Sequence, residues 1–335
     1  MLAYILRRLI ALIPILFGMT IITFVLSHVI PGDPARYAAG LIAGPEQVEQ
    51  VRKEMGLDRP LFQQYLLYMN SLVHGDLGQS FRTHRLVRDD IRRYFPATIE
   101  LSFTAILMST LVGIAMGTLS AYKKNTWIDQ FSRSFSIFGV SMPVFWLSLL
   151  LQIVFYAYLG WFPSGDRITI ALGSPKHITG LFLVDSLMTG DFKRFFSSLY
   201  HIVLPAVSLA LTMLAITSRM TRSSLLDVLG SDYVRTARAK GLNEFRVVCK
   251  HALKNSMIPT TTVIGAQFGW LLGGTFIVET IFSWPGIGTY GVQAIIELDF
   301  PVIMGLTILL SLLYVMINLW VDIVYAFLDP RIEYS

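Results

Sequence analysis

The stretch SDYVRTARAKGL, residues 231–242, decides the fold because it is a charged, helix-favouring segment between two long apolar blocks. The blocks are His201–Ser218 before it and Ile258–Phe282 after it. A helix needs roughly 20 mostly apolar residues to cross the hydrocarbon layer of a bilayer, and these blocks approach or exceed that length. The stretch is therefore expected to be a connection outside the membrane, between two membrane-spanning helices.

Local signals divide this connection into two short helices. Ser231 or Asp232 can cap a helix that begins at Tyr233, and Gly241 is a natural residue for its end. A second helix is expected near Glu244–Leu253. Two helices broken at a glycine would form a compact knob that docks on a partner protein. The alternative is a solvated basic loop held by lipid headgroups, and residue spacing alone leaves both open.

Similar apolar blocks recur along the chain of 335 residues, of which 54% are hydrophobic and 15% are charged. Soluble globular chains usually carry about 25% charged residues. Backbone groups inside hydrocarbon must satisfy their own hydrogen bonds, so each block is expected to be a helix. The sequence therefore predicts an all-α polytopic membrane protein with six transmembrane helices: Leu9–Ile30, Ile99–Ala121, Phe135–Leu159, His201–Ser218, Ile258–Phe282 and Val302–Leu328.

The positions of Lys and Arg predict the orientation, because short cytoplasmic loops collect these residues. Basic residues precede the first block and gather after the second and fourth, whereas the loop 283–301 contains none. Both termini are therefore expected in the cytoplasm. The predicted parts are 1–30, the N-terminal residues and first span; 31–98, a small helical extracytoplasmic cap; 99–328, a core with five spans, a cytoplasmic loop at 219–257 and an outer re-entrant loop at 283–301; and 329–335, a cytoplasmic tail.

The outer segments contain signals for short helices. Pro45 suits the first position of a helix that Gly56 would end, and Pro60 would open a second helix. A third helix is expected near Arg85–Tyr94. The segment Gly160–Tyr200 is expected to form loops with one short helix.

The chain lacks the usual motifs of catalysis and nucleotide binding. It has no Walker A, HExxH or GxSxG motif, its six histidines are scattered, and Cys249 is its one cysteine. A formal GxGxxG match at Gly286, Gly288 and Gly291 follows an apolar helix and not a strand, so a dinucleotide site is rejected. Glycines at this place favour a sharp re-entrant turn. The sequence predicts no catalytic residue, no metal ligand set and no cofactor bound by this chain.

Small residues recur at every fourth position in two apolar blocks. They are Gly113 and Gly117 in the second block, and Gly265, Gly269 and Gly273 in the fifth. That spacing lets helix backbones approach closely. Packing within the chain is the simpler interpretation. The alternative is that the fifth block lies at a subunit interface or lines a pathway.

Ionisable residues within apolar blocks are costly and often functional. Glu100 and Glu279 lie near the outer ends of their blocks and Asp322 near an inner end, so each is expected to reach interfacial water or a polar partner. No acidic residue lies at mid-membrane, which argues against a proton- or sodium-coupled transporter. Pro143 and Pro205 can kink the third and fourth blocks.

Several segments in order resemble those of binding-protein-dependent ABC importer permeases. Residues 231–242 resemble the EAA loop of that family, with Arg235-Thr236-Ala237 in place of Glu-Ala-Ala and with Gly241 retained. The likeness runs from Met1 to Arg331 and is specific to the first permease of the dipeptide, oligopeptide and nickel branch. The other matching segments are Ile30–Pro34, Gly75–Gly78, Phe95–Leu101, His251–Asn255 and Glu279–Gly288.

The resemblance implies a type I ABC importer permease fold in the inner, cytoplasmic membrane of a bacterium. It also implies a heterodimer with a second similar permease, two ATPase subunits that bind ATP and Mg²⁺, and an extracytoplasmic substrate-binding protein. The residues implied to couple to an ATPase are Asp232, Tyr233, Arg235, Thr236, Ala237, Arg238, Ala239, Lys240 and Gly241. Candidates for the pathway and its packing are Gly265, Gly269, Gly273 and Glu279, and candidates for an outer gate or receptor-facing turn are Trp284, Pro285, Gly286 and Gly288.

The resemblance makes dipeptides or short peptides the default substrate. Longer peptides, nickel complexes, glutathione and opines stay open, because selectivity resides largely in the binding protein. Two other classes compete. An intramembrane enzyme would need a converging cluster of acids, bases or metal ligands that the apolar blocks lack, and a channel would form a homo-oligomer around one pore.

Overall fold

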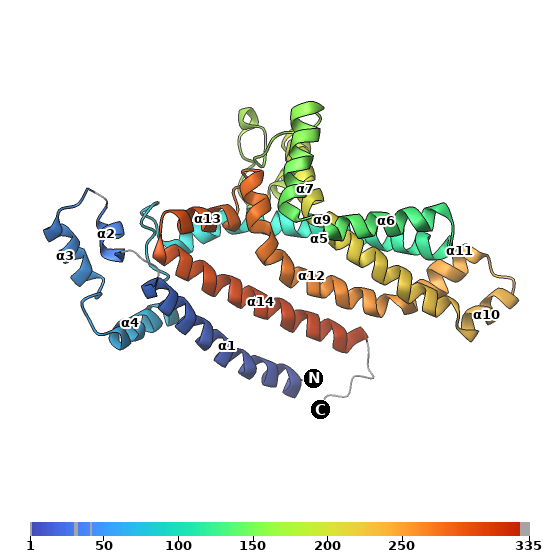
Figure 1. Ribbon diagram of the computed structural model, residues 1–335, viewed down its shortest axis with the longest axis horizontal. Coiled ribbons are helices and arrows are strands. Elements are labelled where there is room, and N and C mark those ends of the chain that lie inside the picture. The colour runs from blue at the N-terminus through green and yellow to red at the C-terminus, as the bar shows by residue number, and fades with distance from the viewer. Residues whose placement is uncertain (1, 30–32, 41, 329–335) are drawn as a thin grey trace. The chain divides into compact units, whose positions relative to one another are not determined.

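The computed structural model describes residues 2–29, 33–40 and 42–328. The predicted tail 329–335, the residues at the Pro31 turn and the side chain of Asp322 lie outside the described part. The regular secondary structure of the described residues is helical, apart from an isolated bridge between Gln79 and Leu86. The all-α prediction is therefore confirmed (Figure 1).

The chain divides into two compact units. The first comprises residues 1–96 and 285–316, and the second comprises residues 97–284 and 317–335. The helix α5 (Val87–Tyr122) and the helix α14 (Phe300–Leu328) each run from one unit into the other. The other helices of the first unit are α1 (Leu2–Val29), α2 (Pro34–Ala39), α3 (Pro45–Glu54), α4 (Leu61–Val73) and α13 (Ile287–Ile296).

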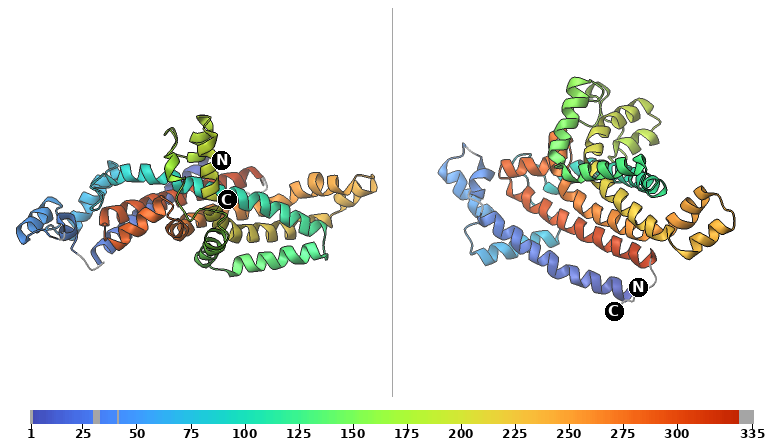
Figure 2. Two further views of the ribbon diagram at one scale, coloured as in Figure 1. Left: turned by 90° about the horizontal axis from the view of Figure 1, so that it is seen from above. Right: turned by 45° about the vertical axis from the view of Figure 1, so that its right-hand side comes forward.

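The second unit is built around the helix α9 (Phe192–Leu229), which packs against α6 (Trp127–Ser141) and α12 (Leu253–Ile281). Its other elements are α7 (Val144–Leu151), a π-helix over Gln152–Tyr158, a 3₁₀ turn over Ile170–Leu172, α8 (Phe182–Met188), α10 (Asp232–Ala239), α11 (Glu244–Arg246) and a π-helix over Val247–Ala252. Two short helices, α10 and α11, lie at the Leu229 end of α9 (Figure 1), and Figure 2 shows this end of the second unit from two further sides.

Three helices are long and apolar enough to cross a membrane among the described residues, or five if each bent pair forms one span. The three are Val87–Tyr122, Phe192–Leu229 and Phe300–Val321. In α1, the apolar part Ile13–Ser27 is shorter. The count of six spans stays a prediction.

The predicted third span is not one straight helix. Met142 and Pro143 are both extended, so the helix stops after Ser141 and restarts at Val144, with a bend of 107° between the two arms. Proline restricts the residue before it to extended conformations, which explains the break. Pro205, in contrast, lies inside α9, which continues past it.

Glycines in the second apolar block allow α5 to pack closely on α9. A Cβ atom added to Gly113 would lie 2.9 Å from Cβ of Thr217, and one added to Gly117 would lie 2.5 Å from the carbonyl oxygen of Ser218. Packing inside a membrane depends on such close van der Waals contact, because lipid tails are as apolar as the side chains they replace. The simpler interpretation of these two glycines, packing within the chain, is confirmed.

Three local predictions need correction. The helix expected near Arg85–Tyr94 is not separate, because α5 begins at Val87 and continues through Pro96. The second helix of the basic connection does not end near Leu253, because the π-helix after α11 runs directly into α12. The outer loop 283–301 is not only a turn, because it contains α13. The predictions at Pro45, Gly56 and Pro60 are confirmed by α3 and α4.

Candidate functional site

The basic connection, here called the basic loop and defined as residues 230–252, stands on an apolar base. Val234 and Ala237 are buried three residues apart on one face of α10. They pack against Leu225 of α9 and against Val247 and neighbouring residues that precede α12. Spacing of three residues on a helix puts side chains on one face, so α10 is held along one side and presents the other side to solvent.

The solvent-facing side of α10 carries most of the polar residues predicted to couple to a partner. The exposed residues are Asp232, Tyr233, Arg235, Thr236, Arg238, Ala239 and Lys240. The phenol of Tyr233 accepts a hydrogen bond of 2.9 Å from Nδ2 of Asn255 at the start of α12. Arg235 lies 3.4 Å from Asp232, but both side chains are largely exposed, so this pair stabilises the helix little.

The predicted start of α10 was wrong by one residue. The helix begins at Asp232, with Ser231 at the cap position. The hydroxyl of Ser231 donates to the carbonyl oxygen of Val228 at 2.6 Å and makes no capping bond to α10. Ala237 was also predicted to couple to a partner, but its side chain is buried against the apolar base of the loop.

Gly241 provides the turn that separates α10 from α11. Its φ angle is +75°, a left-handed conformation that glycine adopts without strain. Its amide donates to the carbonyl oxygen of Arg238 at 2.9 Å. Across the turn, the guanidinium of Arg238 donates to Glu244, with Nη2 2.7 Å from Oε1. These hydrogen bonds raise the pKa of Arg238 and lower the pKa of Glu244.

A buried ion pair joins α6 to α9 near the basic loop. Asp129, near the start of α6, is 1% exposed and accepts two hydrogen bonds from Arg222 of α9, at 2.7 and 2.8 Å. It also accepts from the hydroxyl of Ser120 at 2.6 Å and from the amide of Asn125 at 3.0 Å. Hydrogen bonds from Arg222 hold the pKa of Asp129 well below its usual range, against the opposing effect of burial.

An open cavity of about 530 Å³ lies beside α10. Lys123 and Lys124, from the turn between α5 and α6, contribute to it together with Arg238 and Glu244. The end of α9 supplies the apolar wall through Leu226 and Leu229. The basic loop and this short turn thus form one basic surface with a hollow in it.

The end of the second unit that the basic residues predict to face outward contains a compact cluster around Trp284. The indole is 1% exposed, and its Nε1 donates to the carbonyl oxygen of Ala97 at 2.9 Å. Glu279 is fully buried and accepts a hydrogen bond of 2.6 Å from Thr98. Phe282 packs so closely on Gly165 that a Cβ atom there would lie 2.1 Å from the carbonyl oxygen of Phe282.

A second buried carboxylate belongs to the same cluster. Glu100 pairs with Arg167 at 2.5 Å and accepts from the amide of Leu183 at 2.7 Å. The guanidinium of Arg167 stacks on Phe182 at 3.7 Å from the ring centre and lies 5.7 Å from the ring centre of Trp284. Burial lowers the pKa of Arg167. Glu100 and Glu279 thus have polar partners, as predicted for acids in apolar blocks.

The other candidates for a pathway or gate are dispersed. Gly265 meets α14, where an added Cβ atom would lie 2.9 Å from Val321, whereas Gly273 is exposed with no atom near that position. Gly269 is half-buried, and a 59° bend separates the helix up to Leu271 from the helix after Gly273. The three glycines therefore do not share one contact.

The three residues after Trp284 that were predicted to form an outer gate or turn differ in their surroundings. Pro285 is exposed, Gly286 is the extended residue before α13, and Gly288 is a buried residue within α13. Gly286 therefore lies in the bend that precedes α13. Gly288 lies in a helix that the sequence signals did not predict.

Three charged partners were missed from the sequence: Glu244, Asp129 and Arg167. A signal existed for Glu244, because an acid three residues after a helix-ending glycine can reach back to a base in the preceding turn. Arg167 is 67 residues from its partner Glu100, and Arg222 is 93 residues from Asp129, so no local pattern could pair them.

Comparison with known protein families gives two matches that together cover nearly the whole chain. Residues 110–334 match the family described as binding-protein-dependent transport system inner membrane component. Residues 1–102 match the family of N-terminal regions of such membrane components.

Individual relatives are similar over all or nearly all of their length. A dipeptide transport system permease protein, DppB, of Alkalihalophilus pseudofirmus is 45% identical, with both chains covered completely. A probable D,D-dipeptide transport system permease protein, DdpB, of Escherichia coli is 46% identical over 96% of this chain and 94% of the relative. A glutathione transport system permease protein, GsiC, of Escherichia coli is 40% identical over both complete chains.

A solved structure shares the fold. It is an inward-facing form of the MetNI methionine ABC transporter, in which one chain superposes with a TM-score of 0.50. The match covers 70% of this chain and 93% of that chain, at 15% sequence identity. At that identity, the likeness concerns the fold alone.

Proposed function

The chain belongs to the family of binding-protein-dependent transport system inner membrane components, and we propose that it is the permease subunit of an ATP-driven importer of dipeptides or short peptides. It would move substrate inward across the bacterial inner membrane by alternating access. The chain itself would carry no catalytic residue, and partner ATPase subunits would bind ATP and Mg²⁺ and hydrolyse the nucleotide.

The observation that carries this proposal is the basic loop. A motor protein that drives a membrane helix needs a rigid handle outside the bilayer. The helix α10 meets this need because Val234 and Ala237 anchor it to α9 and to the start of α12, while its other face stays exposed. The pair Arg238–Glu244 closes the turn at Gly241, so α10 and α11 would move as one body.

The mechanism follows from these connections. An ATPase subunit would grip the exposed face of α10 through Arg235, Thr236 and Lys240. Closure of two ATPase subunits on ATP would displace the basic loop, and the buried pair Asp129–Arg222 would transmit that displacement to α6 and α9 together. Arg238 would act mainly by holding Glu244, because its donors already point across the turn.

The proposed assembly contains a second, similar permease, two ATPase subunits and an extracytoplasmic substrate-binding protein. Six spans and cytoplasmic termini complete the proposal, in line with the basic residues of the inner loops. The outer cluster around Trp284 would belong to the external gate. Its buried acids and their partners would hold it closed as a rigid unit until the loop on the other side moves.

The substrate proposal rests on the named relatives, which transport dipeptides, D,D-dipeptides or glutathione by their descriptions. All of these are short peptides. Uptake of a labelled dipeptide by cells that express the importer genes, compared with uptake of labelled glutathione, would distinguish the two leading substrates.

Substitution of Gly241 tests the coupling role. Proline requires φ near −65° and lacks the amide that donates to Arg238, so Gly241→Pro cannot adopt the observed turn. We expect this variant to insert into the membrane normally but to lose ATPase subunits on affinity purification and to lose peptide uptake. Gly241→Asn is the matched control, because asparagine tolerates φ > 0.

The two variants give distinguishable results. Full uptake by Gly241→Pro would refute the role of the turn. Equal loss of uptake in Gly241→Asn would show that the position needs glycine for a reason other than backbone conformation.

A further inference from the structure

The helix α4 differs from its neighbour α3 in a way that a water-exposed cap does not explain. The sequence of α3, PEQVEQVRKE, carries five charged residues, whereas α4, LFQQYLLYMNSLV, carries none. Exposed apolar side chains nevertheless occur along α4, with 71% of Phe62, 50% of Leu66 and 77% of Val73 accessible. Together with the half-buried Met69, they recur at i, i+4, i+7 and i+11, which is one stripe of a helix.

The contacts of α4 with α1 show how deep it lies. Tyr65 of α4 shares a hydrogen bond of 2.8 Å with the hydroxyl of Thr20, and its ring packs on Phe17 and Phe24. Thr20 is nine residues before Val29, so it lies about 14 Å from the end of α1. Half of the hydrocarbon layer is about 15 Å thick. The contact is therefore near the middle of the first predicted span.

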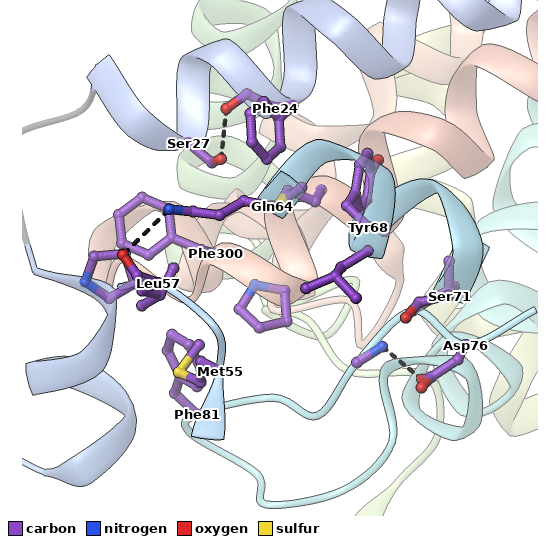
Figure 3. Close-up of a pocket in the computed structure, with 17 residues that line it drawn as sticks. Phe24, Ser27, Met55, Leu57, Gln64, Tyr68, Ser71, Asp76, Phe81 and Phe300 are labelled. Atoms are coloured by element: carbon purple, nitrogen blue, oxygen red, sulfur yellow. Dashed lines mark hydrogen bonds between the residues drawn. The ribbon is translucent and has the colours of Figure 1, made fainter. Parts of the chain in front are cut away.

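A cavity of about 310 Å³ lies beside α4, nearer than Thr20 to the C-terminal end of α1, where Phe24 and Ser27 line it (Figure 3). Phe24 of α1, Leu67 and Tyr68 of α4, and Phe300 and Met304 of α14 are among its walls. Most of the lining is apolar or aromatic. Polar groups at its edge are already engaged, since Gln64 donates to Leu57 and Asp76 accepts from the amide of Gly78.

One polar atom of this wall is buried without a partner. The hydroxyl oxygen of Tyr68 makes no hydrogen bond in the described part of the chain. A buried hydroxyl without a partner costs about 1–3 kcal/mol. The rest of the lining offers mainly carbon atoms, so an apolar chain would fill the space.

We propose that α4 lies within the outer leaflet of the bilayer, and that the cavity between α1, α4 and α14 binds one acyl chain of a phospholipid. The apolar stripe of α4 would face other lipid tails, next to the exposed residues Ile21, Ile22 and Val25 of α1. Of the helices α2, α3 and α4, only α2 and α3 would then stand in water.

The depth and the composition of α4 favour lipid, and not another protein, as the partner of its exposed stripe. A helix of 13 residues is about 20 Å long, too short to span the membrane, yet its contacts reach the level of Thr20. A surface for a water-soluble partner would be expected near the headgroups and would carry a polar rim. No charged residue of α4 supplies such a rim.

Spin labels on single cysteines test the depth of α4 in the importer complex, reconstituted in phospholipid nanodiscs. Cys249→Ser removes the native thiol, and Phe62→Cys and Leu66→Cys place labels on the stripe. Ile22→Cys serves as the lipid-exposed control and Glu46→Cys on α3 as the aqueous control. We expect the α4 labels to collide with oxygen as often as the label at Ile22 does, and to be shielded from a water-soluble nickel chelate.

Two results would overturn the position of α4. If the α4 labels collide with the chelate as often as the label at Glu46 does, α4 lies in water. Shielding from both oxygen and the chelate would mean that another protein covers the stripe.

A photoreactive phospholipid with a diazirine in its acyl chain tests the cavity. We expect it to label the segment 300–305, and Ser71→Trp, which fills the cavity from α4, to remove most of that labelling while labelling of the exposed face of α1 is unchanged. Asn70→Trp, on the exposed side of the same helix, should leave both sites labelled. Ser71→Leu repeats the test with a smaller side chain. Absent labelling of 300–305 in the unmodified chain, or labelling that Ser71→Trp and Ser71→Leu both leave intact, would refute the acyl-chain site.

Discussion

At the scale of single residues, the pair Asp129–Arg222 is more buried than the ion pairs Arg235–Asp232 and Arg238–Glu244 of the basic loop. Asp129 is almost fully buried and has four donors around it, from Arg222, Ser120 and Asn125. A buried charge is stable only with such partners. Removal of either charge leaves the other without compensation, and this asymmetry makes the pair a sensitive test of the packing of α6 on α9.

We predict that Asp129→Asn destabilises the folded protein by about 2 kcal/mol at pH 7. This is less than the 3–5 kcal/mol of fully buried pairs, because Arg222 remains partly exposed. Thermal unfolding in detergent, followed by fluorescence-detected gel filtration, measures the loss. Asp232→Asn is the control, since that carboxylate is 96% exposed and its removal should change little.

The same variant has a defined pH dependence. The folded state lowers the pKa of Asp129, so its contribution is complete above the unfolded value of about 3.9 and is lost as the pH falls through the lower folded value. The stability difference between the two proteins should therefore be constant from pH 6 to 8, on the order of the value at pH 7. A difference that vanished between pH 8 and 6 would contradict this assignment.

Prediction from sequence succeeded at residues whose role is local. Gly241 could be identified because a left-handed residue after a short polar helix is usually glycine. Glu100 and Glu279 could be identified as needing partners because a carboxylate in an apolar block is costly. The partners Arg167 and Thr98 could not, because they are distant in sequence and only the folded chain brings them close.

At the scale of helices, the approach of α5 to α9 depends on the absence of side chains. We predict that Gly117→Ala destabilises the protein by about 1–3 kcal/mol, the range for overpacked cores, because the added methyl group would lie 2.5 Å from the backbone of Ser218. The melting temperature of the purified protein should fall accordingly.

The control for that prediction is Gly273→Ala on α12. No atom lies within 4 Å of the added methyl group there, so the variant should be neutral or up to about 1 kcal/mol more stable through the higher helix propensity of alanine. Equal destabilisation by both substitutions would mean that the cost does not come from the contact between α5 and the backbone of Ser218.

The extents of helices were predicted less well than their existence. Apolar blocks marked the membrane-spanning part of α9, but the helix extends from Phe192 to Leu229 because polar residues at both ends also favour helix. Pro143 was expected to kink a helix, yet it separates two arms. Whether a proline bends or breaks a helix depends on the packing around it, and a sequence pattern does not contain that information.

At the scale of the whole molecule, Cys249 reports the orientation without any mutation. It is the one cysteine of the chain, and it is exposed in the basic loop. We predict that a membrane-impermeant maleimide labels it in inside-out vesicles and not in intact spheroplasts. A Cys249→Ser, Lys176→Cys variant, with the thiol in the outer segment, should show the opposite pattern.

Labelling of Cys249 from outside the cell would invert the topology and would remove the proposed contact with a cytoplasmic ATPase. The membrane orientation is the part of the fold that sequence predicted from charge alone. The division into two compact units was not predictable, because residues 285–316 join the first 96 residues only through tertiary contacts.

The unbroken helix α9 has a mechanical consequence. Its 38 residues give a rod about 57 Å long, nearly twice the hydrocarbon thickness of a bilayer. A tilt of about 5° about one end would carry the other end sideways by about 5 Å. Such a lever converts a slight rocking at Leu229 into a stroke at Phe192 that is comparable to the width of a peptide backbone. Because the length of the arm is set by residue count, deletion of one helical turn would shorten the stroke in proportion.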